Sequence, residues 1–346
     1  MVSISAVQPY DEAAGVRAVW PFVSIIVPTR NRAAYLRDVL GALSNQVYPV
    51  GRMEIIVIDN SSTDETEDVV RQAAVTGPFP VRYLRKQDDG PASSRNRGAE
   101  MATGEILAFT DSDCVPAPGW VRAAVARFDP GVALVCGPIL PVWDGPDPAF
   151  FMHQIYEVMH EDGLYATANV FYRREAFLAR GGFDERFRTY AWGQPVGGDD
   201  TDLAWRVRRA GGMSTFAKDA VVYHQASPIS ARAYLLQPLA AQIIPQLVAR
   251  IPELRTTSLY KRYFLHRQSA TFCLAVAGIV GARRTRTSLV LTLPWLQATW
   301  PAVKRDIWPP RRWGRAGLRF ALQAQSSALL SITLIQSSIR NRSVVL

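Results

Sequence analysis

Cysteine is scarce in this chain of 346 residues, which contains only Cys114, Cys136 and Cys273. The three residues are far apart in sequence and form no CxxC pair, so the chain lacks the spacing of a zinc site or a disulfide framework. This usage suits a reducing compartment. The first 22 residues contain charged side chains and no long apolar run, so we expect no secretory signal peptide.

Acidic residues are almost missing from the last third of the chain. From residue 231 to the end there are 17 Lys and Arg but only Glu253 and Asp306, a net charge of +15. The preceding part has 22 basic and 28 acidic residues, a net charge of −6. This contrast predicts a boundary near Ser227-Pro228. The acidic part argues against nucleic acid as a partner, whereas the basic part suggests an anionic surface.

The first 225 residues alternate between short apolar runs and amphipathic stretches. The apolar runs predict buried strands at residues 23–29, 54–59, 81–84 and 105–110. Residues 36–43 have helical spacing, Ser62 and Glu65 have the spacing of a capping box before a second helix, and residues 93–102 predict a third. This rhythm predicts an α/β fold with a mostly parallel, Rossmann-like sheet covered by helices.

Polar residues follow three of these strands, as Pro28-Thr29-Arg30, Asp59-Asn60 and Asp111-Asp113. Ligands of parallel sheets bind beyond the carboxyl ends of the strands, so we expect the three clusters to converge. Side chains at i and i+2 of an extended chain point the same way, so Asp111 and Asp113 should project together. Two adjacent carboxylates repel, and Mg²⁺ or Mn²⁺ would compensate them. The alternative is an ordinary Asp-Ser turn.

Five ordered segments resemble the family 2 glycosyltransferases of the GT-A fold: "VSIIVPTRNR", "EIIVIDNSSTDET", "GPASSRNRGAEMATGEILAFTDSDC", "ANVFYRREAFLARGGFDE" and "GGDDTDLAWRVRRAG". The resemblance covers about residues 22 to 225. It implies transfer of a sugar from a UDP-, dTDP- or GDP-sugar to a glycan or lipid-linked acceptor, with inversion and with a divalent metal. Together with the charge boundary, it predicts an N-terminal extension (1–21) and a catalytic domain (22–228), with a nucleotide-sugar half to about residue 115 and an acceptor half from about 116. The resemblance does not explain the basic region that follows (229–346), which we expect to be helical.

The resemblance assigns roles on the donor side. Pro28, Thr29 and Arg30 match the first nucleotide contact, and Asp59-Asn60 match the pair that recognises the base, with asparagine in place of the second aspartate. Arg95 matches an arginine near the diphosphate, although it could instead pair with Asp88-Asp89 in a surface network. Asp113 matches the direct metal ligand, and Asp111 lies near the ribose or a metal-bound water. For Asp59, capping of the next helix is the structural alternative.

The resemblance also assigns the acceptor side. Single displacement needs a carboxylate that takes the acceptor proton, and Asp200 matches that base, with Asp199 as the alternate. Asp202 more simply begins the helix "LAWRVRRAG", which Gly211 ends, and helix capping is an alternative for all three acids. His224 would complete the metal site or only end a strand. Trp192 and Gly198 would line the acceptor side, where Trp192 could equally belong to the core and the glycine would let the backbone approach a ligand.

The basic region contains two apolar runs, residues 271–282 and 287–303. Twelve residues make a helix of about 18 Å, shorter than the roughly 30 Å hydrocarbon core, so a spanning helix is doubtful. Basic flanks and tryptophans instead suggest helices on the anionic cytoplasmic face of a membrane. The alternative is a soluble appendage or dimer interface. Two other functions compete: a sugar-phosphate nucleotidyltransferase, for which "VPTRNRAAYL" lacks a Gly-rich loop, and a non-catalytic nucleotide-sugar-binding scaffold.

Overall fold

The computed structural model describes residues 20–87, 90–142, 153–154, 157–187, 189–191, 194–228, 230–307 and 313–346. The elements of the first part are β1 (Val23–Thr29), α1 (Ala33–Ser44), β2 (Met53–Asn60), α2 (Thr66–Thr76), β3 (Val81–Lys86), α3 (Pro91–Met101), β4 (Ile106–Phe109), β5 (Cys114–Pro116), α4 (Trp120–Val125), β6 (Val132–Cys136), β7 (Ile139–Val142), β8 (His153–Gln154), η1 (Thr167–Asn169), β9 (Val170–Arg173), α5 (Arg174–Ala179), β10 (Thr189–Ala191), β11 (Gln194–Val196), α6 (Asp199–Arg209), β12 (Met213–Phe216), β13 (Val222–Gln225) and β14 (Ser227–Pro228). The elements that follow are α7 (Ala231–Leu236), η2 (Gln237–Gln242), α8 (Ile243–Arg250), α9 (Leu254–Thr257), α10 (Arg267–Gly281), η3 (Arg286–Thr292), α11 (Leu293–Ile307) and α12 (Trp313–Asn341).

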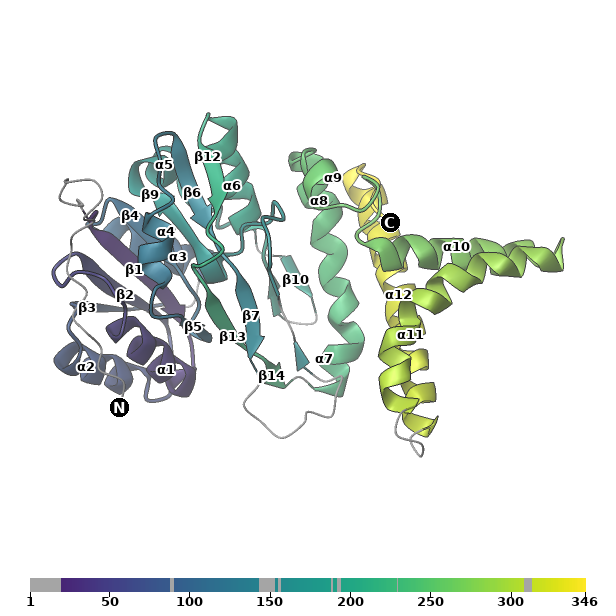
Figure 1. The fold of residues 1–346 in the computed structure, drawn as a ribbon, viewed down its shortest axis with the longest axis horizontal. Coiled ribbons are helices and arrows are strands. Elements are labelled where there is room, and N and C mark those ends of the chain that lie inside the picture. The colour runs from purple at the N-terminus through teal and green to yellow at the C-terminus, as the bar shows by residue number, and fades with distance from the viewer. Residues whose placement is uncertain are drawn as a thin grey trace, which may run out of the picture.

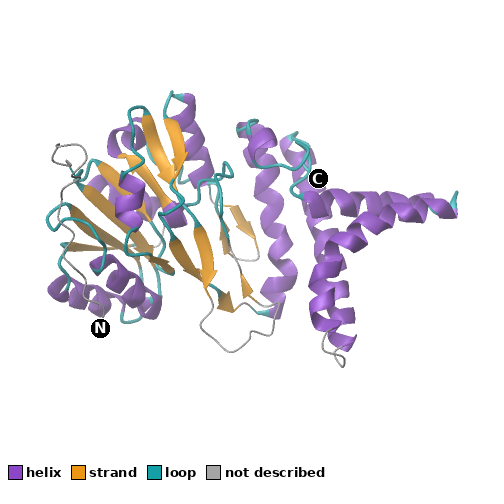
Figure 2. Ribbon diagram, viewed as in Figure 1, coloured by secondary structure: helices purple, strands orange, loops and turns teal. Residues whose placement is uncertain are grey.

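A seven-stranded sheet in the order β12-β6-β9-β4-β1-β2-β3 forms the centre of the first part (Figure 1). Strands β1, β2, β3 and β4 pair in parallel, and β12 pairs in parallel with β6. Only β9 runs against its neighbours β4 and β6. The prediction of an α/β fold with a mostly parallel sheet flanked by helices is therefore confirmed, and Figure 2 shows the helices on both sides of it.

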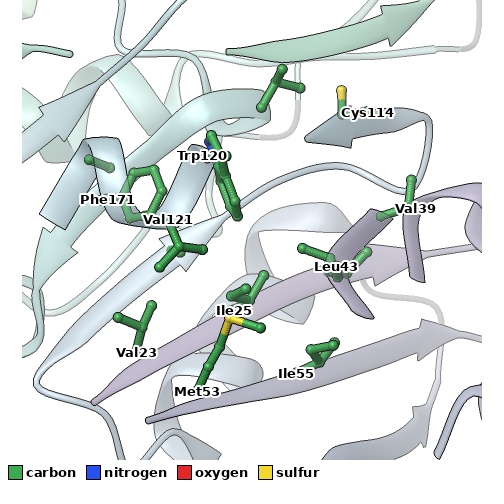
Figure 3. Packing of buried hydrophobic residues seen from close by; sticks show 14 of the residues in the cluster. Val23, Ile25, Val39, Leu43, Met53, Ile55, Cys114, Trp120, Val121 and Phe171 are labelled. Atoms are coloured by element: carbon green, nitrogen blue, oxygen red, sulfur yellow. The ribbon is translucent and has the colours of Figure 1, made fainter. Parts of the chain in front are cut away.

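Two hydrophobic cores cover the two faces of this sheet, because successive strand residues point to opposite sides. Val23, Ile25 and Val27 of β1 pack with α1, α2 and α4, and Figure 3 shows this side around Ile25 and Trp120. Ile26 faces the other way, toward α3 and α6. A continuous apolar strand is thus buried on both faces, as expected for a parallel sheet under two helical layers.

A smaller sheet, in the order β5-β13-β7, lies at the end of β4. The chain turns between β4 and β5, and β5 then pairs antiparallel with β13, so that Cys114 is opposite His224. The prediction that Asp111 and Asp113 continue an extended strand is therefore wrong. Both residues belong to the turn, where the alternation of an extended chain does not apply.

Two helix starts differ from the predictions. Helix α2 begins at Thr66 without the expected capping box, because the Ser62 hydroxyl instead accepts a hydrogen bond from the Asn31 backbone N–H at 2.9 Å. Asp64 Oδ1 accepts from the Thr66 backbone N–H at 3.2 Å. Helix α6 begins at Asp199, earlier than the Asp202 start that the sequence suggested. Its end agrees with the prediction, since Gly211 follows with a φ of +93°.

Beyond β14 the described chain is helical apart from connecting turns. Helix α8 contributes Ile243, Leu247 and Val248 to the core on the α6 side of the sheet. Helices α10, η3, α11 and α12 extend away from the sheet, at the end of the molecule opposite β3 (Figure 1). The apolar runs 271–282 and 287–303 fall in α10 and in η3 with α11.

The sequence analysis missed the long helix α12. Residues 316–341 form the one helix in the described chain that is long and apolar enough to cross a membrane, with a mean hydropathy of 1.2. Only 22% of its most apolar window is buried. Length and composition alone are weak evidence for a membrane span, and α12 packs against η2, α8 and α11.

Candidate active site

The carboxyl ends of β1 and β2 bring the first two polar clusters side by side, because Thr29 is in register with Asp59. Asp59 is buried, and its Oδ1 accepts from the Ser62 backbone N–H at 2.8 Å while its Oδ2 accepts from the Tyr83 hydroxyl at 2.7 Å. Burial, reinforced by Asp59, raises the pKa of Tyr83. Asp59 thus organises the loop after β2 and does not cap α2, which begins only at Thr66. Each of its oxygens keeps a second lone pair for a ligand.

Thr29 supplies a buried hydroxyl at the same edge. Its Oγ1 makes no hydrogen bond within the described part of the chain, although the residue is only 4% exposed. A buried polar atom without a partner is costly, so a ligand that bonds to it would gain free energy. This observation fits the predicted nucleotide contact at Pro28, Thr29 and Arg30. Asn60 is also buried beside this edge, and Arg30 is exposed.

The loops after β1 and β2 are bonded to each other. Besides its bond to Ser62, Asn31 accepts from the Thr63 backbone N–H at 2.7 Å through its side-chain oxygen. The Ala33 backbone N–H donates to Asp64 Oδ2 at 3.0 Å. Asn31 itself has a φ of +51°, which asparagine tolerates better than most residues. The two loops therefore form one rigid border of the site.

Asp113 and His224 meet at the β4–β5 turn and β13. His224 Nε2 lies 4.0 Å from Asp113 Oδ1, and ligand atoms of Asp113, Cys114 and His224 all lie within 4.8 Å of one another. Burial raises the pKa of the Cys114 thiol well above its usual range, so Cys114 is a core residue and a poor ligand. The carboxylate oxygen of Asp113 suits Mn²⁺ or Mg²⁺, whereas the imidazole nitrogen of His224 is a softer ligand that suits a transition metal better than Mg²⁺. The predicted pair therefore fits a divalent metal. The guanidinium of Arg32 also pairs with Asp113 Oδ2.

Asp111 faces a different partner from Asp113. Its Oδ1 accepts from Arg95 Nη2 at 2.7 Å, and Asp111 is not a member of the cluster that could hold an ion. Arg95 is buried, and its Nη1 lies 3.9 Å from Asp199 Oδ2. Burial would lower the pKa of Arg95, but the carboxylates of Asp111 and Asp199 outweigh it and raise that pKa. The arginine predicted near the diphosphate therefore connects two acids of the site.

Asp199 and Asp200 occupy the first turn of α6, where the helix dipole favours negative charge. Burial raises the pKa of both carboxyl groups and the charge of Arg95 opposes it for both, but of the two only Asp199 lies within ion-pair distance of Arg95. Burial, followed by the charge of Asp199, raises the pKa of Asp200 to about 7. Asp200 Oδ1 accepts from the Thr201 backbone N–H at 2.8 Å. Of the two neighbours, Asp200 therefore has the protonation equilibrium of a general base near neutral pH.

Of the two residues predicted to line the acceptor side, the structure describes only Gly198. Trp192 lies outside the described residues. Gly198 has a φ of +130°, and a Cβ there would lie 3.3 Å from Ile243 and Leu247. The tight approach at this glycine within the described chain is to α8. A role for Gly198 beside the acceptor stays a prediction.

Sequence reasoning missed two side chains of the site, Arg32 and Tyr83. Tyr83 could have been found, because β3 continues the parallel order and places a polar ring next to Asp59. Arg32 carried only a weak signal, its proximity in sequence to Arg30. Its partner Asp113 is 81 positions away, and no local pattern connects them.

Fold and site together define an α/β enzyme of the GT-A fold, with its acidic groups at the carboxyl ends of parallel strands. The family model described as Glycosyl transferase family 2 matches residues 24–193. Glycosyltransferase AglE of Haloferax volcanii is 30% identical over 215 residues, which cover 60% of this chain and 68% of AglE. Validoxylamine A glucosyltransferase of Streptomyces hygroscopicus is 29% identical over 237 residues, covering 58% of this chain and 54% of that protein.

Solved structures share the fold. The mannosyltransferase PcManGT from Pyrobaculum calidifontis, in complex with GDP-Man and Mn²⁺, has a TM-score of 0.56 at 22% identity and covers 94% of this chain and 88% of its own. Residues 1–349 of S. aureus TarS, in complex with UDP-GlcNAc, have a TM-score of 0.51 at 18% identity, with coverage of 93% and 92%. The chain belongs to glycosyl transferase family 2, and it is a nucleotide-sugar-dependent glycosyltransferase.

Proposed function

We propose that this enzyme is a metal-dependent inverting glycosyltransferase, which moves a sugar from a UDP-, dTDP- or GDP-sugar to a glycan or a lipid-linked acceptor. One observation carries the proposal. Two adjacent carboxylates at the start of α6 differ in environment, and the one without an arginine partner has its pKa raised to about 7. A carboxyl group whose pKa lies near neutral can accept a proton at the pH at which the enzyme works, as a general base must.

In the proposed reaction, Asp200 accepts the proton of the acceptor hydroxyl as the oxygen attacks the anomeric carbon. The bond from that carbon to the diphosphate oxygen breaks in the same displacement, so the configuration inverts. The nucleoside diphosphate leaves with the bonding electrons. Asp199 stays ion-paired with Arg95 and holds the first turn of α6 toward Asp111. Thr29, Asp59 and their loops hold the nucleotide end of the donor.

Asp113 and His224 would hold the Mn²⁺ or Mg²⁺, with Asp111 close enough in sequence to contact the ribose or a metal-bound water. When bound, the metal would neutralise the charge that develops on the diphosphate leaving group. Two observations support Asp113 and His224 as a pair of ligands. Asp113 Oδ1 and His224 Nε2 are 4.0 Å apart, and β5, which follows Asp113, pairs with β13, which contains His224.

The experiment is a panel of UDP-, dTDP- and GDP-sugars, assayed for Mn²⁺-dependent binding and for transfer. Asp113→Asn should weaken metal-dependent donor binding and abolish turnover, because it removes the anionic ligand. Asp129→Asn, which changes an exposed acid on a surface turn, is the matched control and should leave both unchanged. Full Mn²⁺-stimulated activity in Asp113→Asn would refute the proposed metal site.

We also propose that the basic helical region places the enzyme on the anionic cytoplasmic face of a membrane. Arg283, Arg284 and Arg286 are exposed where α10 turns into η3. Next to them, Ile279 and Val280 are 60% exposed and Val290 is 63% exposed. Basic and apolar side chains on one projecting pair of helices suit an anionic interface.

Truncation near Gln225 would test this proposal poorly, because it would remove the α8 residues that complete the sheet core. Instead, we expect the full-length protein to sediment with anionic liposomes and to be only partly released by high salt. A triple Arg→Gln change at Arg283, Arg284 and Arg286 should weaken this binding, about 1 kcal/mol per residue. Absence of the full-length protein from the pellet at low salt would favour the soluble-appendage alternative.

A further inference from the structure

Arg32 has a position that the proposed reaction does not use. It lies on the loop between β1 and α1, and its side chain is 45% exposed, yet it reaches across to the turn between β4 and β5. There its guanidinium donates to Asp113 Oδ2. An ion pair between two exposed side chains contributes little to stability. The partner of Arg32 is buried, however, so the loop that carries Arg32 must lie next to the turn that carries Asp113.

The backbone on both sides of Arg32 is fixed. Asn31 donates to Ser62 and accepts from Thr63, and the Ala33 backbone N–H donates to Asp64. These bonds attach the backbone on both sides of Arg32 to the border formed after β2. The backbone therefore presents the guanidinium to Asp113 without a loop rearrangement.

Asp113 presents two oxygens to two different neighbours. Oδ1 lies 4.0 Å from His224 Nε2, whereas Oδ2 accepts from Arg32. The carboxylate is only 8% exposed, so the charge of its neighbours is weakly screened by water. A divalent ion bound to Asp113 and His224 would lie next to a second cation, the guanidinium, and the two would repel.

We infer that Arg32 competes with the divalent metal for Asp113, and that it turns from Asp113 to the diphosphate of the donor when metal and nucleotide bind together. The inference rests on the proposed function. Without nucleotide, the guanidinium neutralises Asp113 and the metal binds weakly. A diphosphate supplies the negative charge that both cations can share, so it strengthens metal binding, and by linkage the metal strengthens nucleotide binding equally. Arg32 is thus a positioning residue that makes metal binding depend on the donor.

The test measures binding of Mn²⁺ to the full chain, first with Mn²⁺ alone and then with UDP or GDP added, by calorimetry and by the electron paramagnetic resonance of free Mn²⁺. Arg32→Gln should bind Mn²⁺ alone at least about tenfold more tightly than the wild type, because one neighbouring positive charge is removed. Arg32→Lys keeps the charge and should resemble the wild type. Arg37→Gln, an exposed arginine on α1, is the matched control.

With UDP or GDP present, Arg32→Gln and the wild type should bind Mn²⁺ with equal affinity, since the wild-type guanidinium then pairs with the diphosphate. Equal or weaker binding of Mn²⁺ alone by Arg32→Gln would overturn the inference. Failure of the proposed metal site looks different, because then Asp113→Asn would bind Mn²⁺ as the wild type does, with or without nucleotide. Thermal unfolding of each variant, monitored by circular dichroism, shows whether the substitution has left the fold intact.

Discussion

Asp200→Asn should have opposite effects on activity and on stability. Asparagine keeps the size of the side chain and can still accept the hydrogen bond from the Thr201 backbone N–H, but it cannot take a proton. Loss of a general base lowers the rate of transfer by roughly 10² to 10⁴. Donor and metal binding should survive, because the residues that would hold them lie at the ends of β1, β2 and β4 and on β13.

The effect on stability follows from the raised pKa of Asp200. Ionisation is harder in the folded protein, where the pKa is about 7, than in the unfolded chain, where it is near 3.8. The carboxyl therefore destabilises the fold as pH rises from about 4, and the cost levels off above 7. Linkage gives a cost of about 2 kcal/mol at pH 5 and about 4 kcal/mol at pH 8. Replacing the acid by asparagine removes this cost.

The assay is urea unfolding of the wild type and of Asp200→Asn at pH 5 and pH 8. We expect the variant to be more stable at both values, with a gain that is about 2 to 3 kcal/mol larger at pH 8. Asp129→Asn, at an exposed position, should show no such dependence. The kcat/KM of the wild type should fall about tenfold for each pH unit below 7. If Asp199→Asn reproduces this behaviour and Asp200→Asn does not, the base is the other neighbour.

Two further changes test the charges that hold the site and the sheet together. Arg95→Met should lower the free energy of unfolding by about 3 to 5 kcal/mol, because it leaves Asp111 and Asp199 without their shared counter-charge, and adding Asp199→Asn should restore part of the loss in urea unfolding. Glu54 is buried, which would raise its pKa, but bonds from Ser24, Thr103 and Arg82 lower it below 4.5. The ionised carboxylate of Glu54 thus stabilises the fold above pH 4.5, and this stabilisation is lost as the pH falls through the lowered pKa of the folded protein. Glu54→Gln should therefore cost about 1 to 3 kcal/mol at pH 7 and much less at pH 3, and an equal cost at both pH values would contradict this assignment.

Much of the fold could be predicted because the sheet depends on local patterns. The apolar runs gave the first strands to within one or two residues, and continuous burial on both faces followed from their composition. Convergence of the polar clusters also followed from topology, since parallel strands present their carboxyl ends at one edge. Thr29 and Asp59, which end β1 and β2, are indeed paired in register.

What could not be predicted depends on contacts between distant segments. Ser62 has the spacing of a capping box, yet its hydroxyl bonds to Asn31, a residue of another loop, and the helix starts later. Asp111 and Asp113 appeared to share a direction, but the turn between β4 and β5 points one to Arg95 and the other to Arg32. Propensity and spacing describe neighbours in sequence, whereas these partners are decided by how loops meet in the folded chain.

Arg95 gives the site a property that no single motif contains. It contacts Asp111 after β4 and lies near Asp199 at the start of α6, so one buried guanidinium joins the proposed donor side to the proposed base. Asp200 follows Asp199 directly, and the charge of Asp199 is one cause of its raised pKa. Asp111 is one of the charges that raise the pKa of Asp199, and Asp199 raises the pKa of Asp200. A change of charge at Asp111 should therefore alter the basicity of Asp200 through Asp199. The electrostatic state of the donor side and the strength of the proposed base are therefore coupled through closely spaced, buried charges.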